Sequence, residues 1–138
     1  MGSQMQSLIF PDWPAPDRVR AVTTTRLGGV SPPPFNSFNL GDHVGDDPDQ
    51  VAANRQQLAT LLDLPAEPAW LNQVHGHNVI AAERIAASLD ADAAFTRQPC
   101  VVCAVMTADC LPILLCDRAG THVAAVHAGW RGLTGGGD

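Results

Sequence analysis

The chain has 138 residues, of which 46% are hydrophobic, and a formal net charge of −6. This length supports a single globular domain over residues 1–138, and the negative charge argues against a nucleic-acid surface, which needs clustered cations. All eight basic residues are arginines, which excludes sites that need a lysine, namely Schiff-base centres and P-loops. Neither a membrane span nor a secretory signal is visible in the sequence, so a cytoplasmic protein is predicted.

The first part of the chain predicts a strand followed by a long loop. Val19, Ala21 and Thr23 alternate with other residues, so residues 18–25 are expected to be extended. Residues 26–41 are rich in glycine, proline and asparagine, which predicts an ordered loop without regular structure. Such a loop is either functional or a plain surface excursion.

A helix is predicted next. Asp46-Asp47-Pro48 supplies an N-cap aspartate and a proline at the first helical position, and apolar residues recur at helical spacing up to Asp63. The helix is expected to end before Leu64, which precedes a proline. Residues 69–80 then predict a strand that is interrupted at residues 75–78.

Two apolar runs between Val101 and Gly132 predict a β-hairpin, because the residues between them, 117–120, are typical of a turn. If this turn is centred between Arg118 and Ala119, Cys110 lies directly opposite His127. Pro112 cannot donate to a strand ladder, so a bulge or a sheet edge is expected there.

A thiol and an imidazole on one face of a hairpin can share a metal ion, and a catalytic zinc typically has three protein ligands. The candidates for the third ligand are His43, His75, His77 and His122. His75 is preferred because it ends an apolar run and is followed by a glycine. The other cysteines, Cys100, Cys103 and Cys116, are interpreted as core-filling thiols, although Cys100 and Cys103 have C-x-x-C spacing.

Several motifs together resemble one known family. They are TTRLGGVS at residues 24–31, NLG at 39–41, QVHG at 73–76, TADCLP at 107–112 and HAGWRG at 127–132. In this combination and order they are similar to the YfiH family, also called polyphenol oxidase (laccase domain) or purine nucleoside phosphorylase. The resemblance implies a mixed α/β fold in which a β-sheet packs with helices and a hairpin carries the metal site.

The resemblance also implies a zinc site formed by His75, Cys110 and His127, with the same three residues as catalytic residues. The activities it implies are phosphorolysis of adenosine, inosine, guanosine and methylthioadenosine, with purine nucleosides and phosphate as partners, and adenosine deamination. Alternatives are a copper-dependent phenol oxidase of the laccase type, a peptidoglycan-editing enzyme and an inactive metal-binding fragment. Five histidines are few for a multicopper centre, so the purine nucleoside reaction is favoured.

Five further residues are candidate substrate contacts. Arg26 and Arg131 have the forked guanidinium that binds phosphate, although each can instead form a structural salt bridge. Asp109 is a candidate acid or base, or a candidate partner that orients a ligand histidine. A purely structural role is favoured over both, because alternation along a strand points Asp109 to the face opposite to Cys110. Gln73 and Asn39 complete the set. Family members continue beyond HAGWRG, so we expect this chain to lack the family's C-terminal part.

Overall fold

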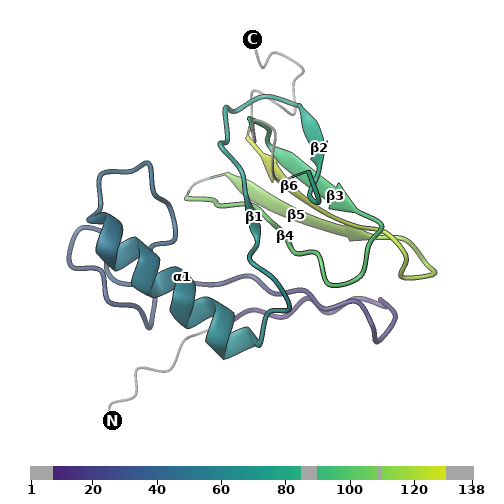
Figure 1. The fold of residues 1–138 in the computed structure, drawn as a ribbon, viewed down its shortest axis with the longest axis horizontal. Coiled ribbons are helices and arrows are strands. Elements are labelled where there is room, and N and C mark those ends of the chain that lie inside the picture. The colour runs from purple at the N-terminus through teal and green to yellow at the C-terminus, as the bar shows by residue number, and fades with distance from the viewer. Residues whose placement is uncertain (1–7, 85–89, 109, 130–138) are drawn as a thin grey trace. The chain divides into compact units, whose positions relative to one another are not determined.

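The computed structural model describes residues 8–84, 90–108 and 110–129. These residues form the predicted mixed α/β fold (Figure 1). The elements in chain order are α1 (Pro48–Leu62), β1 (Ala69–Trp70), β2 (Val79–Ala81), β3 (Ala93–Thr96), β4 (Cys103–Ala104), β5 (Leu111–Cys116) and β6 (Val123–Ala128). The chain divides into two compact units, one drawn from Met1–Trp13 and Arg20–Leu64, the other from Pro14–Val19 and Pro65–Asp138.

The helix of the first unit confirms the sequence prediction at both ends. The Asp47 side chain accepts a hydrogen bond from the Asp49 N–H at 2.9 Å, and Pro48 takes the first helical position. Asp63 caps the other end in a left-handed conformation, with φ at 51°. The helix buries Val51, Leu58 and one polar residue, Asn54.

Asn54 orders the long loop of the first unit. Its side-chain oxygen accepts from the Val30 N–H at 2.9 Å, and its amide nitrogen donates to Ser31 Oγ at 2.9 Å and to the Asn39 carbonyl at 2.8 Å. Because Asn54 is fully buried, these bonds are shielded from water. The loop is therefore ordered without helix or strand, as predicted.

The strand predicted at residues 18–25 is wrong. Within this range the structure contains a single bridge, in which Thr23 pairs with Ile9. The partner segment continues into Pro11, Pro14 and Pro16, which have no N–H to extend a ladder. The pairing therefore stops after one bridge.

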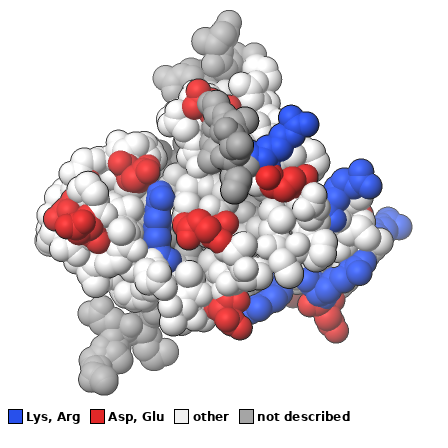
Figure 2. All heavy atoms as spheres, viewed as in Figure 1, with Lys and Arg blue, Asp and Glu red and all other residues white. Residues whose placement is uncertain are grey.

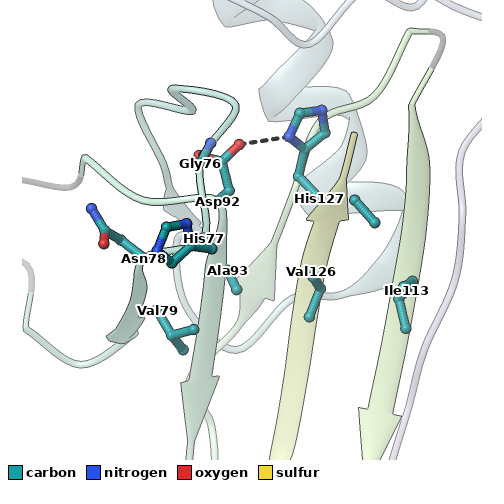
Figure 3. A pocket seen from close by; sticks show the side chains of 10 residues that line it. Gly76, His77, Asn78, Val79, Asp92, Ala93, Ile113, Val126 and His127 are labelled. Carbon is teal, nitrogen blue, oxygen red and sulfur yellow. Dashed lines mark hydrogen bonds and ion pairs between the residues drawn. The ribbon is translucent and has the colours of Figure 1, made fainter. Parts of the chain in front are cut away.

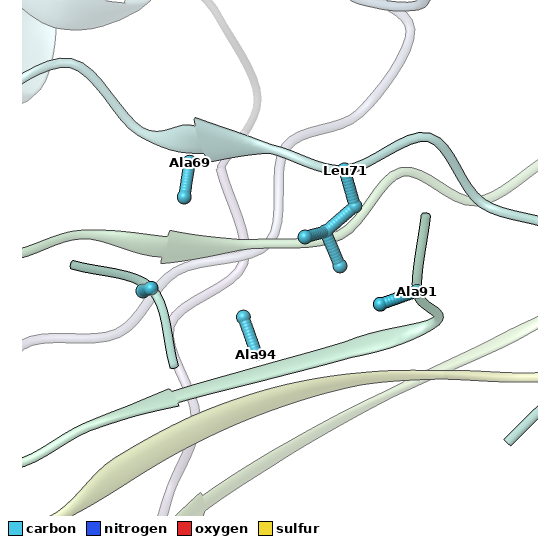
Figure 4. Packing of buried hydrophobic residues seen from close by; sticks show 5 residues of the cluster. Ala69, Leu71, Ala91 and Ala94 are labelled. Atoms are coloured by element: carbon cyan, nitrogen blue, oxygen red, sulfur yellow. The ribbon is translucent and has the colours of Figure 1, made fainter. Parts of the chain in front are cut away.

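The second unit contains two sheets with the hydrophobic core between them. β1 and β4 form a parallel pair, and a four-stranded sheet has the order β2-β3-β6-β5 (Figure 1). β2 runs parallel to β3, whereas β3, β6 and β5 are antiparallel. Ala69 and Leu71 on one side pack towards Ala91 and Ala94 on the other (Figure 4). The predicted strand at 69–80 is thus two short strands, β1 and β2, separated by the predicted interruption.

The β5–β6 hairpin exists, but its predicted register is wrong. His127 pairs with Pro112, and Cys110 lies just before β5 instead of opposite His127. The connection is longer than predicted because Asp117 closes it, accepting from the N–H groups of Thr121 at 2.7 Å and His122 at 3.1 Å. β5 lies at the edge of the sheet, as expected from its proline.

Asp117 makes the stability of this turn dependent on pH. Hydrogen bonds from the Thr121 hydroxyl and the His122 ring hold the pKa of Asp117 well below its usual range. A depressed folded-state pKa means that the stabilisation is complete above the unfolded-state value of about 3.9 and is lost as the pH falls through the folded-state value. We expect Asp117→Asn to lower the Tm at pH 7 and to have a smaller effect at pH 3. Thermal melts of both proteins at the two pH values measure this, and an equal difference at both would contradict it.

On the face shown in Figure 2, acidic and arginine side chains are interspersed among uncharged residues. Within the described part of the chain, no helix combines the length and the apolar character needed to span a membrane.

Candidate metal centre

The structure brings together the three side chains that the sequence selects as metal ligands. The ligand atoms of His75, Cys110 and His127 all lie within 4.8 Å of one another. His75 comes from the connection between β1 and β2, Cys110 directly precedes β5, and His127 lies in β6. His75 is exposed, Cys110 is half-buried and His127 is 5% exposed, so the group is buried on one side and open on the other.

A buried carboxylate, Asp92, positions His75. One oxygen, Oδ1, accepts from the N–H groups of Val74 and Gly76, and Oδ2 accepts from the His75 N–H, each at 3.0 Å. His75 has φ at 61°, a left-handed conformation that costs a non-glycine residue about 1 kcal/mol. The three hydrogen bonds to one carboxylate offset this cost and hold the His75 backbone in place.

The same carboxylate orients His127. Asp92 Oδ2 lies 2.6 Å from His127 Nδ1 (Figure 3), and the Asp92 carbonyl accepts from the His127 N–H at 2.7 Å. Burial raises the pKa of Asp92, but hydrogen bonds from Gly76, His127 and the neighbouring N–H groups outweigh it and lower the pKa overall. Asp92 is therefore ionised at neutral pH and can only accept. The proton consequently sits on His127 Nδ1, which leaves the Nε2 lone pair available to a metal.

The residues around the three ligands leave space at the centre. The rings of His75 and His127 meet edge to face with their centroids 5.2 Å apart. Gly129 is buried beside them, and a Cβ at that position would lie 3.3 Å from Cys110 Sγ. A larger residue would crowd the thiol, so the glycine keeps the site open.

A cavity of about 180 Å³ lies near His127. Its apolar wall comes from the sheet, and the loop that follows His75 contributes the rest (Figure 3). It is lined by Gly76, His77, Asn78, Val79, Asp92, Ala93, Ile113, Val126, His127 and Ala128. Val126 and Ala128 alternate with His127 along β6, so the apolar wall is on the sheet face opposite to the His127 side chain.

Two of the candidate substrate contacts have structural partners. Gln73 donates to the Met106 carbonyl and accepts from the Met106 N–H, both at 2.7 Å, so both ends of its amide are occupied. Asn39 donates to the Gly41 carbonyl and to Asp46 Oδ2, and accepts from the Gly41 N–H. These contacts brace the backbone near the metal ligands and in the long loop, respectively.

The other three candidate substrate contacts are Arg26, Arg131 and Asp109. Arg26 belongs to the first unit, is exposed, and donates from Nε to the Asn36 carbonyl at 2.9 Å. Asp109 and Arg131 lie outside the described residues. The role considered for Asp109, orienting a ligand histidine, is performed by Asp92 for His127.

The remaining histidines stand apart from the three ligands. His43 is exposed beside Asp42, with its Nδ1 3.6 Å from the carboxylate, and His122 is hydrogen-bonded to Asp117. His77 lines the cavity. Among the described residues, His75, Cys110 and His127 form the one group of potential metal ligands.

The other cysteines follow the prediction in part. Cys103 packs against the core, and burial, together with the negative charge of Glu83, raises the pKa of its thiol to about 11. It is therefore protonated at neutral pH, and Cys116 is half-buried. Cys100, however, is exposed and lies in a turn with φ at 65°, so its interpretation as a core-filling thiol is wrong.

Asp92, the residue that links two of the ligands, is not among the candidate residues predicted from the sequence. A detectable signal existed, because Asp92 lies between Ala91 and Ala93 in a short run of alanines that the fold buries. An acidic residue inside a buried run needs donors around it. The sequence does not show which donors they are.

Comparison with known proteins places the chain in a family. The family described as "Multi-copper polyphenol oxidoreductase laccase" matches residues 20–136. The "Purine nucleoside phosphorylase YfiH" of Escherichia coli (strain K12) is 56% identical over 133 residues, which cover 96% of this chain and 55% of the relative. The crystal structure of Neisseria meningitidis protein NMB0706 has a TM-score of 0.87 at 53% identity, and covers 94% of this chain and 53% of that one.

A second solved structure, YlmD from Geobacillus stearothermophilus, has a TM-score of 0.76 at 35% identity, over 84% of this chain and 47% of its own. The chain thus spans about half the length of the relatives it matches. The matches in sequence and in fold agree with each other and with the motifs around His75, Cys110 and His127. The chain therefore belongs to the multi-copper polyphenol oxidoreductase laccase family, the family of the YfiH proteins.

Proposed function

We propose that His75, Cys110 and His127 bind zinc and form the centre of a purine nucleoside phosphorylase. The observation that carries this proposal is the meeting of one thiol and two imidazoles within 4.8 Å, with one side open. Sulfur and imidazole nitrogen are preferred zinc ligands, and three protein ligands leave a fourth position for water or substrate. The relatives' printed names, "Purine nucleoside phosphorylase", support the reaction.

In this proposal, Asp92 orients two of the ligands and the ligands themselves define the open and closed sides of the site. Asp92 keeps the proton on His127 Nδ1, so that Nε2 stays a lone-pair donor, and it fixes the His75 backbone. Substrate is proposed to approach from the side of the exposed His75, since His127 on the other side of the site is buried. His75, Cys110 and His127 would hold the zinc, which would supply Lewis-acid chemistry at this centre.

In phosphorolysis the C1′–N9 bond of the nucleoside breaks, a phosphate oxygen bonds to C1′, and the purine leaves with a proton. Arg131, four residues after the ligand His127 in the sequence, is the proposed phosphate contact because a guanidinium binds phosphate through two hydrogen bonds. The proposed substrates are adenosine, inosine, guanosine and methylthioadenosine. Deamination of adenosine, in which water adds at C6 and the 6-amino group leaves as ammonia, is a second reaction proposed at the same centre.

Phosphorolysis is tested by incubating the 138-residue chain with zinc, inosine and inorganic phosphate. We expect hypoxanthine and ribose 1-phosphate to appear in equal amounts and only when phosphate is present. Cys110→Ala should remove the activity, and Cys116→Ala should keep it. A wild-type rate no higher than that of Cys110→Ala would overturn the proposal, and would favour a metal-binding chain without turnover.

A second candidate, copper-dependent phenol oxidation, is favoured by the family description and by the donor set, because blue-copper centres use two histidines and one cysteine. Multicopper oxidation needs several copper sites, whereas the described residues contain one group of suitable ligands. Oxygen consumption by the copper-loaded chain with a simple phenol measures this activity. A rate that survives in Cys110→Ala would exclude it.

A further inference from the structure

Two of the three metal ligands follow the paired strands β1 and β4. The two strands are parallel, and their ladder ends at the pair of Trp70 and Ala104. His75 lies shortly after the end of β1, and Cys110 lies shortly after the end of β4. The separation of these two ligands therefore depends on what holds the two segments together beyond the last backbone pair.

Beyond this pair, the chain that leaves β1 changes its partner. The backbone of Asn72 forms a parallel bridge with Asp90, and the Asn72 carbonyl accepts from the Ala91 N–H at 3.2 Å. The Gln73 side chain keeps the contact with the segment after β4. Its Nε2 donates to the Met106 carbonyl and its Oε1 accepts from the Met106 N–H, both at 2.7 Å. A primary amide presents a donor and an acceptor, as a peptide group does, so Gln73 supplies the link that the backbone no longer forms.

The two hydrogen bonds between Gln73 and Met106, here called the Gln73 clamp, contribute position more than stability. The Gln73 side chain is half-buried, and ordering a long glutamine side chain costs about as much free energy as two neutral hydrogen bonds contribute. The clamp does, however, fix the place of Met106 relative to the residue that lies two positions before His75.

A zinc centre needs such a link because it tolerates little displacement of its ligands. Distances from zinc to sulfur and to imidazole nitrogen vary by only about 0.2 Å in proteins. Asp92 holds His75 and His127 through the hydrogen bonds described above. The third ligand, Cys110, lies in the segment that the Gln73 clamp holds.

We propose that Gln73 is a positioning residue that keeps Cys110 within bonding distance of a metal ion shared with His75. This role rests on the proposed zinc centre, and it replaces the substrate contact expected for Gln73 from the sequence. Both polar atoms of the Gln73 amide are occupied by Met106. Loss of the amide should therefore weaken the bond between the metal and the Cys110 thiolate more than the bonds to the two imidazoles.

Gln73→Met tests this role, because methionine keeps the length of the side chain and removes both hydrogen bonds. We expect a zinc affinity about 10- to 100-fold below that of wild type, the range for residues that orient metal ligands. With cobalt(II) in place of zinc, we expect the sulfur-to-cobalt charge-transfer band to weaken, since this band reports the bond to the Cys110 thiolate. Competition with a chromophoric chelator measures the affinity, and near-ultraviolet absorption measures the band.

Gln57→Met is the matched control. Gln57 is also half-buried, and its amide donates to the Gly28 carbonyl at 2.6 Å, but it belongs to the first unit and not to the ligand group. We expect its zinc affinity and its cobalt band to equal those of wild type. Circular dichroism melts establish that each variant is folded. Gln73→Glu, which keeps the acceptor and loses the donor, replaces Gln73→Met if that variant does not fold.

The possible results separate the role of Gln73 from the zinc centre itself. Wild-type affinity and an unchanged cobalt band in folded Gln73→Met would overturn the positioning role without affecting the zinc centre. Equal losses in Gln73→Met and Gln57→Met would also overturn it, because the effect would then come from stability. If the wild-type chain bound neither zinc nor cobalt, the proposed zinc centre would fail together with the positioning role.

Discussion

Replacing Asp92 with alanine is expected to lower the free energy of unfolding by about 3–5 kcal/mol, the cost of leaving several buried donors unpaired. The carboxylate is 1% exposed and accepts from three N–H groups and from the His127 ring. Alanine leaves all four without a partner. Urea titration followed by tryptophan fluorescence, to which Trp70 of the second unit contributes, measures the loss.

Asp92→Asn removes the negative charge at this position and keeps the size of the side chain, so it tests the effect of the charge. The amide fills the same space and keeps one acceptor oxygen, but its NH₂ group faces donors, so we expect intermediate stability. Zinc affinity should fall about 10- to 100-fold in this variant, since it loses the carboxylate that orients His127. Asp90→Asn is the control, because Asp90 is exposed and lies two residues away. Equal zinc affinity in Asp92→Asn and wild type would show that Asp92 has no positioning role.

Replacing Cys110 with serine is expected to reduce zinc affinity at least 100-fold, more than the loss of an orienting partner, because it removes one of three direct ligands. The change substitutes one atom and leaves the adjacent β5 strand untouched, so the Tm of the metal-free protein should change little. Competition with a chromophoric zinc chelator measures the affinity.

Cys116→Ser is the matched control for Cys110→Ser. Cys116 is also half-buried and ends the strand that Cys110 precedes, but it is not part of the ligand group. We expect its zinc affinity to equal that of wild type. If both serine variants lost zinc equally, the effect would arise from β5 and not from a sulfur–metal bond.

Features set by neighbouring residues could be predicted from the sequence. The helix boundaries follow from Asp47 and Pro48 at the first end and from Leu64, which precedes a proline, at the second end. The long loop and the interruption after β1 follow from glycine and proline content. Each of these features depends on residues within a few positions of one another, so the sequence contains the necessary information.

Features set by distant residues could not be predicted in this way. The hairpin register depends on the Asp117 side chain binding N–H groups across the turn, which lengthens the connection and moves Cys110 out of the strand pairing. Asp92 reaches His75 and His127 across 17 and 35 positions of sequence. The three ligands meet although the predicted register is wrong, because Asp92 fixes His75 and His127, and Cys110 lies at the start of β5.

The most direct test of the central claim is the metal content of the purified chain, measured by inductively coupled plasma mass spectrometry. We expect one zinc ion per wild-type chain, and almost none in a chain that carries His75→Ala, Cys110→Ser and His127→Ala together. Equal zinc content in the wild-type and triple-variant proteins, both folded by circular dichroism, would contradict it.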